Sequence, residues 1–255
     1  MTLQDVDKIY FLHLSDRYDR EQWMNNQIQQ IGFPKDKVNI WWTCRRNISN
    51  EVSKYIESLH SDFYELYKDE NPGIGGGIFN CVFEHYSIIR TSYERGFNYI
   101  LIFEDDVKFM VDLPVFEKFI ELLPNDFHIC KFHYNLWDGD ILLQESSNHQ
   151  EIPTLETKIE IPYYIYNDYG NLKYKSWSFS TGAYILDRQG MKDMIEYYNK
   201  DFCVADWIFA KIQNSTVYHC NYQLVSTQDW NCQWYEYLPS DLWKINTNQK
   251  FSQFQ

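Results

Sequence analysis

The sequence predicts an α/β protein whose central sheet, mixed but mostly parallel, is flanked by helices. Short apolar runs alternate along the chain with longer segments of helical spacing. Residues 8–43 give a strand, a helix and a second strand, the pattern of a β-α-β unit. Residues 97–103 are apolar almost throughout, which is typical of a strand buried on both faces of an α/β sheet.

The length and composition favour one globular domain. The chain has 255 residues, of which 44% are hydrophobic and 23% charged, so it can bury a full core. No segment rich in proline or glycine divides it, and we expect a single domain over residues 1–255.

The charge and the cysteines narrow the functional classes. A net charge of -13 disfavours nucleic acid and anionic membranes, because both attract basic surfaces. No apolar run is long enough to span a membrane. The six cysteines are scattered without zinc-site spacing, so we expect buried thiols. The first strand begins by Lys8, leaving no room for a signal peptide, and we expect a cytoplasmic protein.

The N-terminal elements follow in order. Residues 8–14 predict a strand, and residues 18–31 a helix that Gly32 ends. Residues 38–42 predict a second strand, and an amphipathic helix is expected over 53–67.

The middle of the chain continues the alternation. A helical stripe over 78–95 leads into the apolar strand, and a helix over 115–123 precedes a strand over 127–132. Residues 138–157 are polar and irregular, and strands at 163–165 and 172–177 flank a turn. We expect 138–175 to form a lid, or a loop and hairpin insertion that contacts the acceptor.

The C-terminal third predicts a strand over 183–186 and a helix over 188–198. A short helix is expected over 206–212, followed by extended segments at 217–219 and 223–226.

Three acids directly after the apolar strand are the main chemical feature. Glu104, Asp105 and Asp106 stand where open α/β sheets bind ligands, beyond the carboxyl end of a strand. Adjacent carboxylates resist ionising together, and a hard divalent cation such as Mg²⁺ or Mn²⁺ would neutralise them. The alternative is a solvated strand end or the first turn of a helix.

Two further segments could contact an anion. Gly75–Gly77 open a helix, where backbone N–H groups favour phosphate, although the same glycines suit a flexible loop or cap. Arg17 and Arg20 follow the first strand and suit phosphate oxygens. Neighbouring aspartates could instead pair with both arginines.

Three single residues are further candidates for the functional site. Asp206 is either a helix N-cap or a general base whose pKa its apolar neighbours raise. His219 is either a third metal ligand or a structural histidine. His85, on the helix before the acidic strand, is suited to hydrogen-bonding strand ends.

The order of these motifs resembles glycosyltransferase family 25, which contains bacterial lipooligosaccharide galactosyltransferases and procollagen galactosyltransferase domains. The first strand with Asp16–Arg20, the His85 helix with Glu104–Asp106, and the segment Thr181–Gly190 resemble its three blocks. Asp206 and the segment 223–228 resemble its later acid and final motif. The similarity spans residues 8 to 230 in the family's order.

The resemblance implies a GT-A-like domain that uses a UDP-sugar, usually UDP-galactose, with Mn²⁺ and with inversion at the sugar carbon. We expect metal ligation by Asp106, Glu104 and His219, with Asp206 as the catalytic base. The donor contacts that we expect are Leu12, His13, Arg17, Arg20, His85, Glu104, Asp105 and Gly182.

We therefore expect a metal-dependent glycosyltransferase that moves a sugar, galactose by resemblance, to a hydroxyl group. A glycan, a lipid-linked sugar or a protein side chain could be the acceptor. Two other classes stay open: an inactive, carbohydrate-binding relative of such enzymes, and a phosphoesterase that uses clustered carboxylates and metals.

Overall fold

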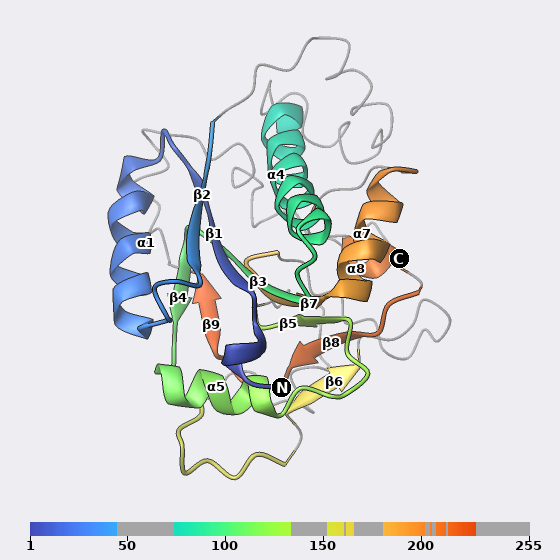
Figure 1. Ribbon diagram of the computed structural model, residues 1–255. Coiled ribbons are helices and arrows are strands. Elements are labelled where there is room, and N and C mark those ends of the chain that lie inside the picture. The colour runs from blue at the N-terminus through green and yellow to red at the C-terminus, as the bar shows by residue number, and fades with distance from the viewer. Residues whose placement is uncertain are drawn as a thin grey trace, which may run out of the picture.

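The computed structural model describes residues 1–44, 74–133, 152–160, 162–165, 181–201, 205, 208–212 and 214–227 (Figure 1). The expected helix over 53–67, most of the 138–175 insertion and Asp206 lie outside these residues.

A seven-stranded sheet in the order β2-β1-β3-β7-β5-β8-β6 forms the centre of the described chain. Its strands are β1 Lys8–Leu14, β2 Val38–Thr43, β3 Tyr99–Glu104, β5 Ile129–Lys131, β6 Tyr163–Ile165, β7 Ala183–Asp187 and β8 Val217–Cys220. β1 pairs in parallel with β2 and β3, and β5 pairs in parallel with β8. β7 is antiparallel to both β3 and β5, and β6 is antiparallel to β8. Most strands therefore share one direction, which confirms the mixed, mostly parallel sheet.

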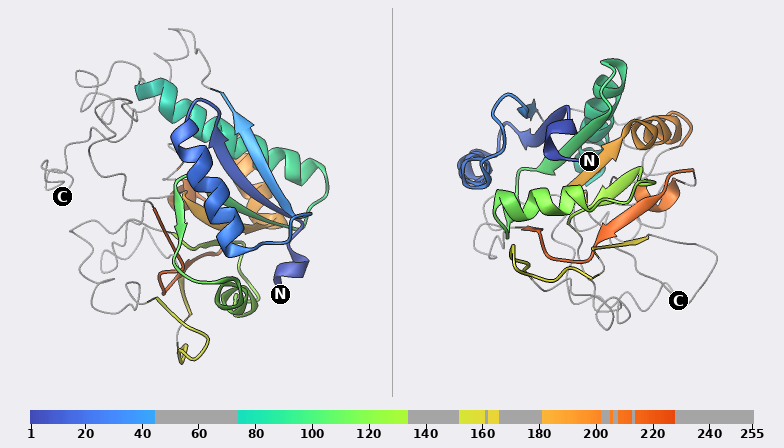
Figure 2. Two further views of the ribbon diagram at one scale, coloured as in Figure 1. Left: turned by 90° about the vertical axis from the view of Figure 1, so that its left-hand side faces the viewer. Right: turned by 60° about the horizontal axis from the view of Figure 1, so that its bottom comes forward.

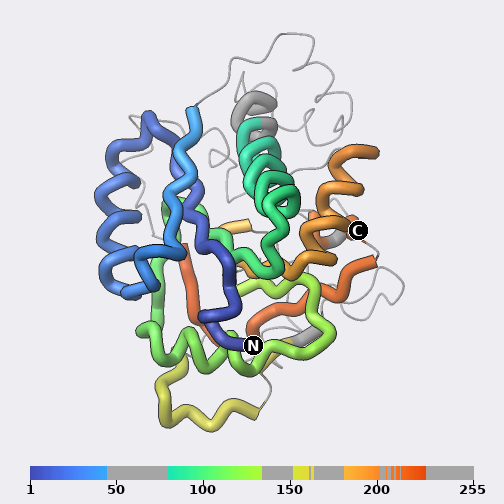
Figure 3. The backbone as a smooth tube through the Cα atoms, in the orientation of Figure 1, coloured from blue at the N-terminus to red at the C-terminus, as the bar shows by residue number. Residues whose placement is uncertain are grey.

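Helices cover both faces of this sheet (Figures 1 and 2). They are α1 Tyr18–Ile31, α4 Ile74–Glu94, α5 Leu113–Glu121, α7 Arg188–Tyr198 and α8 Ile208–Lys211, with a 3-10 turn at Leu3–Asp5. One buried cluster joins α1 and α5 to the sheet, and a second joins α4, α7 and α8 to the opposite face. The backbone trace shows the same two layers on either side of β1 and β3 (Figure 3).

The alternation of side chains along the strands separates the two cores. Phe11 and Phe103 stack at 5.1 Å between ring centroids on the α1 face. Tyr10 and Ile102 pack on the α4 face. Because successive side chains of a strand point to opposite faces, the same alternation decides where the acids after Phe103 point.

Most predicted elements are confirmed, with β1, α1 and α7 at the expected bounds. α4 begins at Ile74, so Gly75–Gly77 lie inside the helix rather than in a loop before it. α5 begins two residues early, because Asp112 caps it by accepting a hydrogen bond from the Val115 N–H at 3.1 Å. The expected extended segment at 223–226 is β9 Val225–Thr227. It pairs outside the main sheet with β4 Val107–Phe109, which the sequence did not predict.

Helix α7 packs very closely on β5. Asp187 caps it by accepting a hydrogen bond from the Gly190 N–H at 2.7 Å. A Cβ atom at Gly190 would overlap the His128 carbonyl and approach the Ile129 Cγ1 atom to 3.0 Å. Only glycine fits this contact without displacing backbone.

None of the helices in the described residues is long and apolar enough to cross a membrane.

The substitution Gly190→Ala should lower the free energy of unfolding by about 1–3 kcal/mol, because the added methyl group meets fixed backbone. Chemical denaturation would measure the loss. Lys192→Ala, on the same helix at a half-exposed position, is the control and should change stability by no more than about 0.5 kcal/mol. Equal losses in both variants would contradict the close-packing argument.

Candidate functional site

The three acids at the end of β3 point to different sides of the sheet. Glu104 contacts His85 of α4, whereas Asp105 contacts Arg20 of α1. This split follows from the alternation of β3, which places Ile102 and Glu104 on one face and Phe103 and Asp105 on the other. The pleat of the strand thus separates Glu104 from Asp105, whereas Asp105 and Asp106 both contact Arg20 Nη1.

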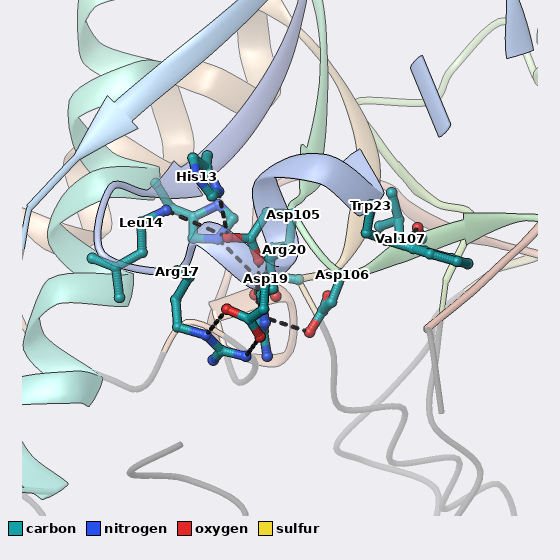
Figure 4. A network of polar contacts seen from close by, with 12 residues as sticks. His13, Leu14, Arg17, Asp19, Arg20, Trp23, Asp105, Asp106 and Val107 are labelled. Atoms are coloured by element: carbon teal, nitrogen blue, oxygen red, sulfur yellow. Dashed lines mark hydrogen bonds and ion pairs between the residues drawn. The ribbon is translucent and has the colours of Figure 1, made fainter. Parts of the chain in front are cut away.

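Asp105 is held by groups from β1 and α1 (Figure 4). His13 Nδ1 lies 2.9 Å from its Oδ2 atom, and Arg20 donates from Nη1 to Oδ1 at 2.7 Å. The backbone N–H of Leu14 donates to Oδ2 at 3.4 Å. Burial opposes ionisation, but the hydrogen bond to His13 and the charge of Arg20 lower the pKa of Asp105 below its usual value. Both of its oxygens are engaged within the protein.

Asp106 is in a different position. Arg20 Nη1 lies 3.1 Å from its Oδ2 atom, while its Oδ1 atom is buried and accepts no hydrogen bond from the described residues. Burial raises the pKa of Asp106 to about 6, against the opposing charge of Arg20, and Glu104 and Asp105 add to the rise. A buried carboxylate oxygen without a donor is the kind of atom that a cation binds.

Glu104 has its own partners on the α4 face. His85 Nε2 lies 3.2 Å from its Oε1 atom, and the Thr181 hydroxyl donates to the same oxygen at 2.7 Å. The Tyr184 hydroxyl lies 2.7 Å from His85 Nδ1 and orients the ring. Although burial opposes ionisation, hydrogen bonds from His85 and Thr181 lower the pKa of Glu104.

The charges of this cluster do not balance within the described chain. Three carboxylates form ion pairs there with one guanidinium, that of Arg20, and otherwise with the imidazoles of His13 and His85. Two imidazoles supply full positive charge only when protonated. A divalent cation would therefore complete the charge balance at neutral pH.

The remaining predicted donor contacts are brought to the same edge. Leu12 lies opposite Glu104 in the β1–β3 register, and the Gly182 carbonyl accepts a hydrogen bond from the Glu104 N–H at 2.9 Å. Arg17 points to its own helix and donates from Nε and Nη2 to Asp19 at 2.9 and 2.7 Å. Arg17 therefore pairs with a neighbouring aspartate, which was the structural alternative, whereas Arg20 contacts Asp105 and Asp106.

His219 is not brought to the acids. It lies on β8 opposite Lys131 of β5, three strand intervals from β3. That spacing corresponds to roughly 14 Å between backbones. In the described chain, the His, Cys, Asp and Glu side chains close enough to share a metal are Cys81, His85 and Glu104.

Three residues near the acids were missed by the sequence reasoning. Thr181 orients Glu104, and Tyr184 orients His85. Both lie in the segment Thr181–Gly190 that resembles the family's third block, and this resemblance was the sequence signal for them. Trp42 is the next-to-last residue of β2 and is 52% exposed, and its ring packs edge-on against His13 at 4.9 Å between centroids. The sequence signal for it was the Trp41–Trp42 pair at the carboxyl end of the predicted strand over 38–42, the end of a strand where α/β sheets bind ligands.

Comparisons with known proteins identify the family of this chain. The profile of Glycosyltransferase family 25 (LPS biosynthesis protein) matches residues 6–208. The chain is 22% identical over 190 residues to Procollagen galactosyltransferase 1-A of Xenopus laevis, covering 74% of this chain and 28% of that protein. It is 27% identical over 195 residues to Inactive glycosyltransferase 25 family member 3 of Homo sapiens, again covering 74% and 28%.

A bacterial protein is also similar. Lipooligosaccharide biosynthesis protein lex-1 of Haemophilus influenzae is 27% identical over 149 residues, covering 55% of this chain and 46% of that protein. The chain thus spans less than half the length of each of these relatives.

The substitution Arg20→Met should lower the free energy of unfolding by about 3–5 kcal/mol, because it leaves two buried carboxylates without their guanidinium. Denaturation in the presence of EDTA would measure this loss without help from added metal. Arg90→Met is the control: it breaks an exposed pair with Glu94 and should change stability by no more than about 0.5 kcal/mol. An equally small loss of stability in Arg20→Met would show that Arg20 does not neutralise Asp105 and Asp106.

Proposed function

Because this chain belongs to glycosyltransferase family 25, we propose that it transfers a sugar from a UDP-sugar to an acceptor hydroxyl group. The donor sugar that we propose is galactose, in line with the similarity to a procollagen galactosyltransferase. The sheet supports this assignment by gathering the acids and their partners at the carboxyl ends of β1, β2 and β3, where nucleotides bind in α/β proteins.

The observation that carries the proposal is the Oδ1 atom of Asp106. It is buried at the strand end and receives no hydrogen bond from the described residues, beside an acid cluster with excess negative charge. A structural acid in this position would be expected to have a donor for each buried oxygen. A role in holding a bound cation accounts for both the position and the charge.

The residues fit Mn²⁺ or Mg²⁺, which both prefer oxygen ligands. Asp106 would supply the protein's main ligand, with Glu104 as the next carboxylate. Asp105 is less suited, because His13 and Arg20 occupy both of its oxygens. When bound, such a metal stabilises the negative charge that develops on a departing diphosphate.

The other side chains bind and orient the donor. Arg20, between two acids, fixes their geometry and places a guanidinium beside the diphosphate. Trp42 offers an exposed ring at the end of β2 on which the uracil base can stack. Glu104, held by Thr181 and His85, is placed to accept a hydrogen bond from a ribose or sugar hydroxyl.

Asp206 is the residue that we propose as general base, on the family resemblance. It would take the proton of the acceptor hydroxyl as that oxygen attacks the anomeric carbon, with inversion there. The bond to the diphosphate oxygen breaks as the new glycosidic bond forms. A glycan, a lipid-linked sugar or a protein hydroxyl would all suit this step.

A second candidate function is binding without catalysis. The similarity to an inactive human member of the family favours it, because the same fold can retain ligand binding after losing turnover. Calorimetry with UDP, with and without Mn²⁺, followed by a hydrolysis assay over several UDP-sugars separates the two. Metal-dependent UDP binding with sugar-specific hydrolysis supports the enzyme, and binding without hydrolysis supports the inactive relative.

The substitution Asp106→Asn should weaken metal-dependent UDP binding by at least about 100-fold, because it removes the carboxylate charge at the metal. Calorimetry would measure binding, and thermal unfolding would verify the fold. Glu94→Gln, an exposed change on α4, should bind UDP like the wild type. Near-normal binding by Asp106→Asn would remove this residue from the metal site.

The substitution Asp206→Asn should reduce turnover by about 10²–10⁴-fold while UDP and Mn²⁺ still bind, because it removes only the proton acceptor. Steady-state transfer or hydrolysis rates would measure the effect, with the exposed change Asp201→Asn as control. Loss of folded protein instead would show that Asp206 acts as a helix cap.

A further inference from the structure

A second group of metal-binding side chains lies on the α4 face of β3. Cys81 and His85 are one helical turn apart on α4, so their side chains share a face of the helix. Because α4 runs antiparallel to β3, its N-terminal half lies beside the carboxyl end of that strand, where Glu104 is. One ligand atom from each of the three residues lies within 4.8 Å of the other two.

Neighbouring side chains already support this group. The Tyr184 hydroxyl is 2.7 Å from His85 Nδ1, which leaves Nε2 directed at Glu104. The Thr181 hydroxyl holds the Glu104 carboxylate from another side. Metal-binding histidines usually engage their second nitrogen in this way, which fixes the orientation of the ring. The His85–Glu104 pair is therefore pre-oriented before any metal arrives.

The spacing suits a tetrahedral ion. Zinc bound at its usual distances to a nitrogen and an oxygen would hold these two atoms about 3.3 Å apart. His85 Nε2 and Glu104 Oε1 are 3.2 Å apart. The Cys81 ligand atom needs only a small side-chain adjustment to join them, since it lies within 4.8 Å and its side chain is half-buried rather than locked in the core.

The ligand chemistry separates this group from the Asp106 site. A thiolate is a soft ligand and favours Zn²⁺, whereas Mn²⁺ and Mg²⁺ favour carboxylates and water. Asp106 supplies only oxygen, and it is absent from the described group that contains the thiol. Two ions of different character thus have different positions, with Glu104 between them.

We propose that Cys81, His85 and Glu104 form a zinc site with one open coordination position. Binding releases the thiol proton of Cys81 to the solvent. Zinc takes the place of the Nε2 proton that His85 donates to Glu104, and the neutral ring then carries its one proton on Nδ1, toward the Tyr184 oxygen. Zinc held there engages Glu104, so it should inhibit donor binding. That last consequence rests on the proposed function, whereas the zinc site itself does not.

Cobalt binding to the full chain without UDP tests the site directly. Co²⁺ replaces Zn²⁺ in such sites and gives strong visible bands when tetrahedral, with a near-ultraviolet charge-transfer band when a thiolate binds. We expect both bands in the wild type and their loss when Zn²⁺ is added. Cys81→Ser should lose the thiolate band and bind Co²⁺ at least about 100-fold more weakly.

Two further variants make the result specific. Cys44→Ser changes an exposed thiol at the end of β2 and should leave the cobalt spectrum unchanged. Tyr184→Phe keeps the ring but removes the hydroxyl beside His85, and should weaken Co²⁺ binding by about 10-fold. This variant and the wild-type spectrum decide the question even if Cys81→Ser does not fold.

The proposal is overturned if wild-type protein gives only weak octahedral bands, or if the thiolate band survives in Cys81→Ser. Because no nucleotide is present, this outcome is independent of transferase activity. Thiolate–cobalt binding without any UDP-sugar hydrolysis would sustain the zinc site and count against the proposed enzyme.

Discussion

Three consecutive carboxylates, one buried and two partly buried, lie at one strand end, and the packing around them has to offset their charge. Burial disfavours each charge, and adjacent like charges disfavour each other. The pleat of β3 reduces the repulsion by placing the Glu104 and Asp105 side chains on opposite faces of the sheet. Arg20 of α1 offsets part of the negative charge through ion pairs of 2.7 Å with Asp105 and 3.1 Å with Asp106. Two features remain unbalanced within the described residues: the buried Oδ1 atom of Asp106, which accepts no hydrogen bond, and an excess of negative charge.

The fold places different chemistry on the two sides of this strand. On the α1 side, the acids meet a guanidinium and a histidine, and the exposed ring of Trp42 stands next to His13. On the α4 side, Glu104 meets His85, Thr181 and, within reach, the thiol of Cys81. Under the two proposals, Glu104 would be shared between an oxygen-only site for a hard cation and a site that includes a thiolate, which suits zinc.

Local patterns predicted the elements well where a segment carried its own boundary. α1 ends at Gly32, whose φ of 75° suits glycine, and α7 starts at the Asp187 cap. β4 was missed because three residues after an acidic turn carry too little periodicity to stand out. Gly75–Gly77 suggested a loop because glycine is a poor helix former, yet the helix includes them.

The sequence by itself determined the α/β class, the strand that ends in Glu104, Asp105 and Asp106, and the family, because these depend on contiguous residues. Only the tertiary structure decided which partner each acid takes. Asp105 meets a histidine 92 positions away, and Glu104 meets a threonine 77 positions away. Such pairs depend on strand order and on which helix covers which face, and no local pattern encodes either. The same reason placed His219 away from the acids and Cys81 beside them.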